Sequence, residues 1–221
     1  MPMPRCLSSG VGLLVCHSFF LIHGADIYFT RLQHDEWELP QNLGCDINSA
    51  GGEASPSYFE DESGNAFLYF SSNRAGGFEP GGVDSDIYFS LNFGPAQLSP
   101  GLNTASDDSR PNVRKDGREV VFDSTRPGTL GLLPDIWTAS RESSPDDWSP
   151  PEHLEAPINS MAAETRATLS WEGLTMVFGS PVPAAKDPPT FTSRRARNSQ
   201  GMNGETKINV LVEERRPERP V

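Results

Sequence analysis

Cysteine, positive charge and long apolar runs are all scarce in this sequence, and each scarcity excludes a class of protein. The three cysteines, Cys6, Cys16 and Cys45, all lie in the first part of the chain. They form neither a disulfide framework nor a Cys-x-x-Cys metal site, so we expect packing alone to hold the fold. The 18 Lys and Arg stand against 30 Asp and Glu, which gives a net charge of -12. Because an acidic surface repels phosphate, we predict no nucleic-acid partner.

A mostly apolar stretch from Val11 to Ile22 follows Arg5 and precedes Gly24 and Ala25. A basic residue, an apolar run and then small residues are the order of a signal peptide. The run is too short to span a bilayer, so we expect no stable transmembrane span. We interpret residues 1–24 as a signal-like or non-native leader, with a buried strand of the fold as the alternative. A genuine signal peptide would place the protein in the periplasm or outside the cell.

The C-terminal segment differs in charge from the rest of the chain. Residues 1–180 carry 10 basic against 25 acidic side chains, whereas residues 181–221 carry 8 against 5. Prolines and an arginine cluster at residues 194–197 add to the contrast. This composition predicts a mostly disordered tail in which only residues 208–212 alternate like a strand, and a basic docking arm is the alternative.

Glycine and proline are abundant, with 20 of each among 221 residues. Such a share disfavours a bundle of helices, because both residues interrupt helical backbone. It favours many short strands joined by turns.

An internal repeat organises the middle of the chain. One phrase, an Asp-Ile pair followed by an aromatic residue, occurs three times, at intervals of 60 and 49 residues. A second phrase, an Asn followed five residues later by an acid, recurs at intervals of 55 and 56. The copies are Asp26-Ile27-Tyr28, Asp86-Ile87-Tyr88 and Asp135-Ile136-Trp137 for the first phrase, and Asn48 with Glu53, Asn103 with Asp108 and Asn159 with Glu164 for the second.

Each repeat predicts four short strands. A first strand and a glycine turn lead into an apolar second strand, the Asp-Ile phrase forms the third, and a Trp-x-x-Pro-x-x-Leu segment leads to the fourth. Four strands in about 50 residues is the signature of a β-propeller blade, whose sheet buries both faces. We therefore predict an all-β fold with propeller repeats over 25–180, divided into units at 25–47 (partial), 48–102, 103–158 and 159–180 (partial).

The repeats resemble the WD-like propeller repeats of the TolB family. The family's Pro-x-x-Ser-x-Asp-Gly first strand corresponds to Pro111–Gly117, and its Phe-x-Ser-x-Arg second strand corresponds to Phe70–Arg74 and Phe122–Arg126. A glycine-rich link precedes Asp86, as it does in the family. The resemblance implies a propeller fold and leaves the function open, since such propellers serve in protein complexes, as lectin-like binding domains and alongside hydrolases.

The propeller is expected to be incomplete or open. The third repeat has Ala167 in place of a proline, and Ser180-Pro181-Val182 stands where an arginine should follow. The chain then holds the last two strands of one blade, two whole blades and the first two strands of another, about 12 strands in all. Closed propellers typically have at least about four blades. Open blade edges would allow self-association.

Recurring charged residues are the candidate binding residues. Acids that recur in every unit are expected to be structural, accepting hydrogen bonds from backbone amides or pairing with the arginines of the same motif. The alternative is a ring of carboxylates that faces a central channel and binds a cation or a basic peptide. The candidates are Glu53, Arg74, Asp86, Asp108, Arg126, Asp135 and Glu164.

Two further features are weaker candidates. Residues 73–85 are rich in glycine and hold Glu79 and Asp84, which could ligate Ca2+ together with Asp86, but we expect a plain loop and neither a metal site nor a cofactor. Trp37 and Trp148 recur before the fourth strand and could stack on sugars. Their recurrence favours packing in the core.

The predicted function is non-enzymatic recognition of a protein or carbohydrate ligand by an acidic TolB-like propeller. We predict no catalytic residue, because the sequence has neither a Gly-x-Ser-x-Gly elbow nor a phosphate-binding loop. The alternative is a glycoside hydrolase, or a hydrolase-associated propeller, that uses channel carboxylates. Asp61 and Asp123, which lie outside the repeated acid positions, are the candidates for that chemistry.

Overall fold

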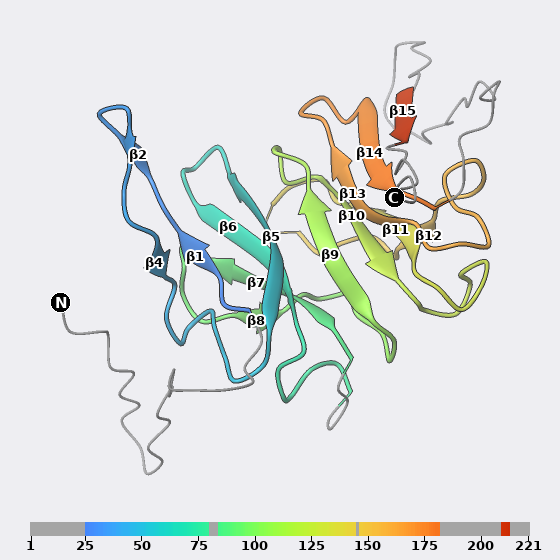
Figure 1. The fold of residues 1–221 in the computed structure, drawn as a ribbon, viewed down its shortest axis with the longest axis horizontal. Helices are drawn as coiled ribbons and strands as arrows, with labels where there is room; N and C mark the ends of the chain where they lie inside the picture. Colours follow the sequence, from blue (N-terminus) through green and yellow to red (C-terminus); the bar gives the residue numbers. More distant parts are fainter. Residues whose placement is uncertain (1–24, 80–83, 145, 182–208, 213–221) are drawn as a thin grey trace, which may run out of the picture.

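The computed structural model describes residues 25–79, 84–144, 146–181 and 209–212, and its regular structure is entirely β (Figure 1). The predicted leader and most of the predicted disordered tail lie outside these residues. The described ranges contain no helix, and so none that is long and apolar enough to cross a membrane. The prediction of an all-β fold is confirmed.

Two four-stranded antiparallel sheets form the centre of the molecule, and each follows the order of the sequence. The first central sheet consists of β5 (Glu53–Glu60), β6 (Ala66–Ser72), β7 (Asp86–Leu91) and β8 (Gln97–Leu98). The second central sheet consists of β9 (Asp108–Val113), β10 (Glu119–Ser124), β11 (Asp135–Ser140) and β12 (Glu152–His153). Each sheet lies within one of the two predicted complete units.

Smaller sheets flank the central pair at its two ends (Figure 1). At one end β1 (Tyr28–Phe29) pairs with β4 (Gln41–Asn42), and the hairpin of β2 (Leu32–Gln33) and β3 (Glu36–Trp37) lies between them in the sequence. At the other end β13 (Thr165–Leu169) pairs with β14 (Thr175–Gly179), whose second edge carries β15 (Asn209–Val212) in parallel. The strands that the repeats predict are therefore all present, β15 lies in the part of the tail that alternates like a strand, and β2 and β3 are additional.

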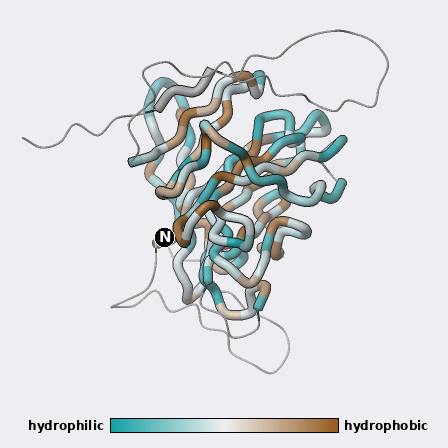
Figure 2. The backbone as a smooth tube through the Cα atoms, turned by 90° about the vertical axis from the view of Figure 1, so that its right-hand side faces the viewer, coloured by the Kyte–Doolittle hydropathy of each residue, from teal (hydrophilic) through white to brown (hydrophobic). Residues whose placement is uncertain are grey.

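Apolar clusters fill the spaces between neighbouring sheets. Along β6, Phe67 and Tyr69 pack toward the second central sheet, whereas Leu68 and Phe70 pack toward the β1–β4 end. On β10, Val121 packs in the same way toward β13 and β14. Both faces of each central sheet are therefore buried, which explains why β6 and β10 are continuous apolar runs. Figure 2 shows these apolar stretches within the strands and polar stretches at the connecting loops.

Hydrogen bonds also join the first strands of successive sheets, β5, β9 and β13, which lie side by side. The Val113 N–H donates to Ser57 Oγ of the preceding sheet at 2.9 Å. One repeat later, the Leu169 N–H donates to Asn112 Oδ1 at 2.9 Å. These amides find their partners only at this separation of the sheets, so the bonds help to fix how the sheets stack.

The expectation that both recurring tryptophans lie in the core is wrong for Trp37. Trp148 is buried between the central sheets, where its ring meets Tyr69 edge-on at 6.1 Å between ring centroids. Trp37 lies on β3 with 69% of its surface exposed. The reason is that a preceding sheet covers Trp148, whereas among the described strands no sheet precedes the β1–β4 pair.

Candidate functional site

The three recurring acids lie in a repeated hydrogen-bond network at the start of each first strand. Glu53, Asp108 and Glu164 are fully buried. Each carboxylate accepts hydrogen bonds from the N–H and the hydroxyl of a Ser or Thr four residues earlier. Each also accepts one from a serine at the end of the second strand. The acid thereby ties the loop before its sheet to the second strand of that sheet.

Two of the three networks also contain an ion pair. Arg126 Nη2 lies 2.6 Å from Asp108 Oδ1, and Arg74 Nη2 lies 3.2 Å from Glu53 Oε1. Both guanidinium groups lie over aromatic rings of their own sheets. The third repeat has Val182 at the arginine position. Because the carboxylates are buried and bonded, the geometry favours the structural interpretation, and a direct binding role for these residues stays a prediction.

A buried asparagine clamps the third strand of each unit. Asn103 Oδ1 accepts a hydrogen bond from the Ile87 N–H at 2.7 Å, and its Nδ2 donates to the Ile87 carbonyl at 2.9 Å. Asn48 and Asn159 clamp Ile27 and Ile136 in the same way, so each asparagine holds the isoleucine of the unit before its own. A primary amide supplies one donor and one acceptor side by side, which explains why asparagine recurs at this position.

Asp86 and Asp135 hold the loops that precede the third strands. Asp86 Oδ2 accepts a hydrogen bond from the Phe78 N–H at 2.8 Å, and Asp135 Oδ2 accepts one from the Leu130 N–H at 2.7 Å. His153 Nε2 lies 2.6 Å from the same oxygen of Asp135. Burial raises the pKa of Asp86 to about 6, and the bond from Phe78 opposes that rise. Both carboxylates therefore serve contacts between a loop and a strand of their own sheet.

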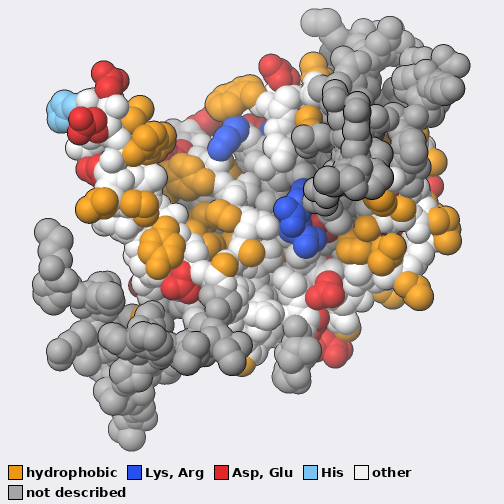
Figure 3. Space-filling view, in the orientation of Figure 1, with side chains coloured by type: hydrophobic (Ala, Val, Ile, Leu, Met, Phe, Trp, Pro, Cys, Tyr) orange, Lys and Arg blue, Asp and Glu red, His pale blue; other side chains and the backbone are white. Residues whose placement is uncertain are grey.

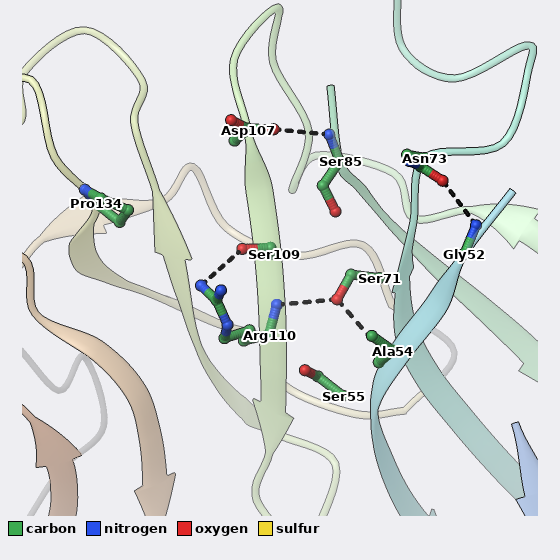
Figure 4. Close-up of a pocket in the computed structure, with 10 residues that line it drawn as sticks. All are labelled: Gly52, Ala54, Ser55, Ser71, Asn73, Ser85, Asp107, Ser109, Arg110 and Pro134. Atoms are coloured by element: carbon green, nitrogen blue, oxygen red, sulfur yellow. Dashed lines mark hydrogen bonds between the residues drawn. The ribbon is translucent and has the colours of Figure 1, made fainter. Parts of the chain in front are cut away.

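A polar pocket of about 400 Å³ lies where the first strands of the two central sheets meet (Figure 4). Its walls are rich in hydroxyl and amide groups, and Asp107 is the one carboxylate among the lining residues. None of the predicted binding residues lines it. The lining residues are Gly52, Ala54, Ser55, Ser71, Asn73, Ser85, Asp107, Ser109, Arg110 and Pro134.

A left-handed residue in each first strand shapes this region. Ser55, Arg110 and Arg166 have φ angles of 53°, 53° and 61°, and each stands two residues after the buried acid. The strand register shifts at all three places, which is the mark of a β-bulge. The first two bulges place Ser55 and Arg110 on the pocket wall (Figure 4). This conformation costs a non-glycine residue roughly 1 to 2 kcal/mol, which makes Ser55 and Arg110 candidate functional residues, and Arg166 shares it without lining the pocket.

Several polar groups of the pocket are available to a ligand. Within the described part of the chain, no hydrogen bond engages the hydroxyls of Ser55 and Ser85 or the side-chain nitrogen of Asn73. By contrast, Ser71 Oγ accepts a bond from the Arg110 N–H at 3.1 Å and donates to a carbonyl of β5 at 3.3 Å. The Ser71 hydroxyl is thus already hydrogen-bonded within the protein, whereas the three other side chains keep donors and acceptors that a ligand can use.

Arg110 is the cation of the pocket, and Asp123 positions it. Arg110 Nη1 lies 2.9 Å from Asp123 Oδ2, with 34% of the arginine side chain exposed and the aspartate fully buried. The carboxylate also accepts bonds from the Arg166 N–H at 3.0 and 3.1 Å. Burial raises the pKa of Asp123 to about 6, and the hydrogen bond and charge of Arg110 oppose that rise. Asp123 is therefore out of reach of a ligand in the pocket.

Arg110→Gln is expected to raise the pKa of Asp123 above about 6, because it removes a cation that favours the ionised carboxylate. A carboxyl whose pKa is raised from 3.8 by folding contributes stability at low pH, and this contribution is lost as pH rises through the folded-state pKa. In the variant this contribution should be lost over a higher pH range. The substitution should therefore lower the free energy of unfolding more at neutral pH than at acid pH. Urea unfolding from about pH 4 to about pH 8 measures this. Parallel pH profiles for wild type and variant would contradict the coupling.

Asp61, the second candidate acid, caps a turn. Its Oδ1 accepts hydrogen bonds from the N–H groups of Ser63 and Asn65 at 2.9 and 2.8 Å. The side-chain amide of Asn65 donates to Oδ2, and these bonds hold the pKa of Asp61 below its usual range. Part of the proposed calcium loop at 73–85 lies outside the described residues, and the described ones contain no cluster of three potential metal ligands.

Sequence reasoning missed the pocket, and the repeat signals only that one position of each first strand is polar. The position two residues after each acid is Ser55, Arg110 and Arg166, a polar side chain each time. The left-handed backbone of these residues is what makes them functional candidates. Comparison with known proteins adds no assignment, since no protein-family model matches the chain and no curated protein matches it.

Proposed function

We propose that this chain is a non-enzymatic, TolB-like β-propeller scaffold whose polar pocket binds a protein or carbohydrate partner. Two features support the propeller architecture: the central sheets are antiparallel in sequence order, and each buries both of its faces. The observation that carries the binding function is the strained placement of Ser55 and Arg110 on the pocket wall.

The chemistry of the pocket favours a ligand group that is rich in hydrogen-bonding atoms. The hydroxyls of Ser55 and Ser85 both donate and accept, and the Asn73 side chain offers a donor. Arg110 adds a planar set of donors whose charge Asp123 partly balances. Sugar hydroxyls and the exposed main chain of a protein loop both present the alternating donors and acceptors that such a surface matches.

The glycoside hydrolase alternative has less support from this pocket. Such enzymes use two carboxyl groups on opposite sides of the scissile bond, at separations of about 5 to 9.5 Å. Asp107 supplies the one carboxyl group among the residues that line the pocket, and its Oδ1 accepts a hydrogen bond from the Ser85 N–H at 2.9 Å. Asp123 lies buried behind Arg110. The arrangement suits holding a ligand better than cleaving it.

Glycan and peptide arrays probed with the full chain are expected to select a ligand, and a panel of glycosidase substrates is expected to show no turnover. Ser55→Gly and Ser85→Ala should each weaken binding about fivefold by removing one hydrogen bond. Thermal stability should be retained, because glycine suits the left-handed backbone at position 55 and the Ser85 hydroxyl has no partner within the described residues.

Ser63→Ala is the matched control, since it removes a serine hydroxyl in the exposed Asp61 turn, away from the pocket. It should change neither stability nor affinity. Turnover of any selected sugar would defeat the scaffold proposal. Unchanged affinity in both pocket variants would show that the ligand binds outside the pocket.

A further inference from the structure

The two ends of the described structure carry complementary halves of one sheet. β13 and β14 follow the repeat positions of a first and a second strand, with Glu164 at the start of the first. β1 and β4 follow those of a third and a fourth strand, with the Asp26-Ile27-Tyr28 phrase leading into the third. The halves lie at opposite ends of the row of sheets (Figure 1). Joined in the order β13-β14-β1-β4, they would make one complete four-stranded sheet.

We propose that a second copy of this chain completes the sheet, with its β1 pairing antiparallel to β14 of the first copy. This inference rests on the propeller architecture proposed above. Within the described residues, β1 offers an edge without a partner strand, and β14 offers an edge that β15 occupies in parallel. β1 pairs only with β4 among the described strands, so its other edge has no partner strand. The outer edge of β14 accepts strands, because β15 lies against it.

The repeat fixes the register of the proposed pairing. In the first central sheet Phe70 of the second strand stands opposite Tyr88 of the third, and the second central sheet repeats this as a Phe opposite a Trp. The corresponding residues at the open ends are Phe178 and Tyr28. Pairing them places Ser180 opposite Asp26, as Ser-Asp pairs stand at the same place in both central sheets. The two halves therefore match at both of these positions.

Exposed side chains mark the surfaces that this pairing would cover. Tyr28 is 56% exposed, whereas its counterpart Tyr88 is buried against the second strand of its sheet. Val177 is 40% exposed, whereas its counterpart Val121 is buried against the next sheet. Trp37 likewise lacks the preceding sheet that covers Trp148. Figure 3 shows apolar side chains at both sides of the face in view as well as across its middle.

Two copies joined in this way form a closed ring. The described residues of each copy contribute two complete sheets and two halves, so in a pair of copies they make six complete sheets related by a twofold axis. Six blades fall within the range of about four to eight that closed propellers have. Closure of one chain on itself would give only three, which is below that range.

β15 occupies the edge of β14 within one chain, and it does so in parallel, with Phe178 beside Val212. In both central sheets the same edge takes an antiparallel strand. Antiparallel pairs are slightly more stable per residue. The second copy's β1 therefore displaces β15, and weakening β15 should tighten the dimer.

Light scattering coupled to gel filtration of the full chain tests the proposal. The wild-type protein is expected at twice the monomer mass of 24.1 kDa. Tyr28→Glu and Val177→Glu should each return it to the monomer mass, because they place a charge in the joined sheet or on its covered face. Both residues are exposed in the single chain, so the variants should still fold.

Leu132→Glu is the control, because Leu132 is 97% exposed in the loop before β11, outside the proposed interface. It should remain dimeric. Leu211→Pro, which removes a ladder donor from β15, should raise the dimer fraction. A wild-type monomer at concentrations well above micromolar would overturn the proposal. So would a dimer that survives both Glu substitutions, or one that Leu211→Pro weakens.

Discussion

Asp108→Asn is expected to lower the free energy of unfolding by about 3 to 5 kcal/mol, because it leaves the charge of Arg126 without a partner in a buried site. Arg126 Nη2 lies 2.6 Å from Asp108 Oδ1, and both side chains are almost completely buried. The asparagine oxygen can still accept the bond from the Thr104 N–H, so the substitution removes the ion pair and the bond from the Ser124 hydroxyl to the same oxygen but keeps the link to the preceding loop. Urea unfolding at neutral pH measures the change.

Glu164→Gln is the matched control for this prediction. Glu164 occupies the same place in the third repeat and accepts the same bonds from Ser160, but Val182 stands at the arginine position. We expect a loss of about 1 kcal/mol, the value of weakened hydrogen bonds without an orphaned charge. Equal losses in the two variants would show that the Arg126 pair contributes nothing beyond the hydrogen bonds.

Asn103→Ala is expected to lower the free energy of unfolding by about 2 to 3 kcal/mol, because it leaves the buried Ile87 N–H without a partner and leaves the Ile87 carbonyl with only its bond from the Ser99 N–H. Asn103 Oδ1 accepts the Ile87 N–H and its Nδ2 donates to the Ile87 carbonyl, and both groups lie in the core. The alanine can replace neither bond. The measurement is again urea unfolding, read as the shift of the midpoint at constant slope.

Asn112→Ala provides the comparison for Asn103→Ala. Asn112 is half-buried and accepts a single bond from the Leu169 N–H, so its removal should cost about 1 kcal/mol. The ratio of the two losses tests whether the clamp acts on both groups of Ile87. Losses of equal size would mean that Asn103 acts through one bond only.

The repeats allowed most of the strand order to be predicted from the sequence. The Asp-Ile phrases begin at or just before β1, β7 and β11, and the acids Glu53 and Asp108 begin β5 and β9. Such positions are predictable because each is set by contacts that span less than one repeat: an asparagine that bonds an isoleucine 16 to 23 residues earlier, or an acid that caps the start of one strand. β15 also lies in the one part of the tail whose alternation predicted a strand.

The pocket could not be predicted, because it depends on how two sheets stack. Its walls come from residues as far apart as Gly52 and Pro134, and no local pattern brings them together. The bulge at Arg110 requires a left-handed backbone that sequence propensity disfavours, so only the structure reveals it. Trp37 was misplaced for a related reason: repetition predicts a residue's place in its sheet, whereas burial depends on whether a neighbouring sheet covers it.

The affinity of Glu53→Gln for the array-selected ligand tests the central claim most directly, that the repeated acids serve the fold and the pocket serves binding. Glu53 stands next to Gly52 of the pocket wall, yet its carboxylate bonds only inward, to Ser49, Ser72 and Arg74. The account predicts a lower unfolding midpoint together with wild-type affinity, measured at a temperature where the variant is folded. An unchanged midpoint with lost affinity would contradict it and make the buried acid the binding group.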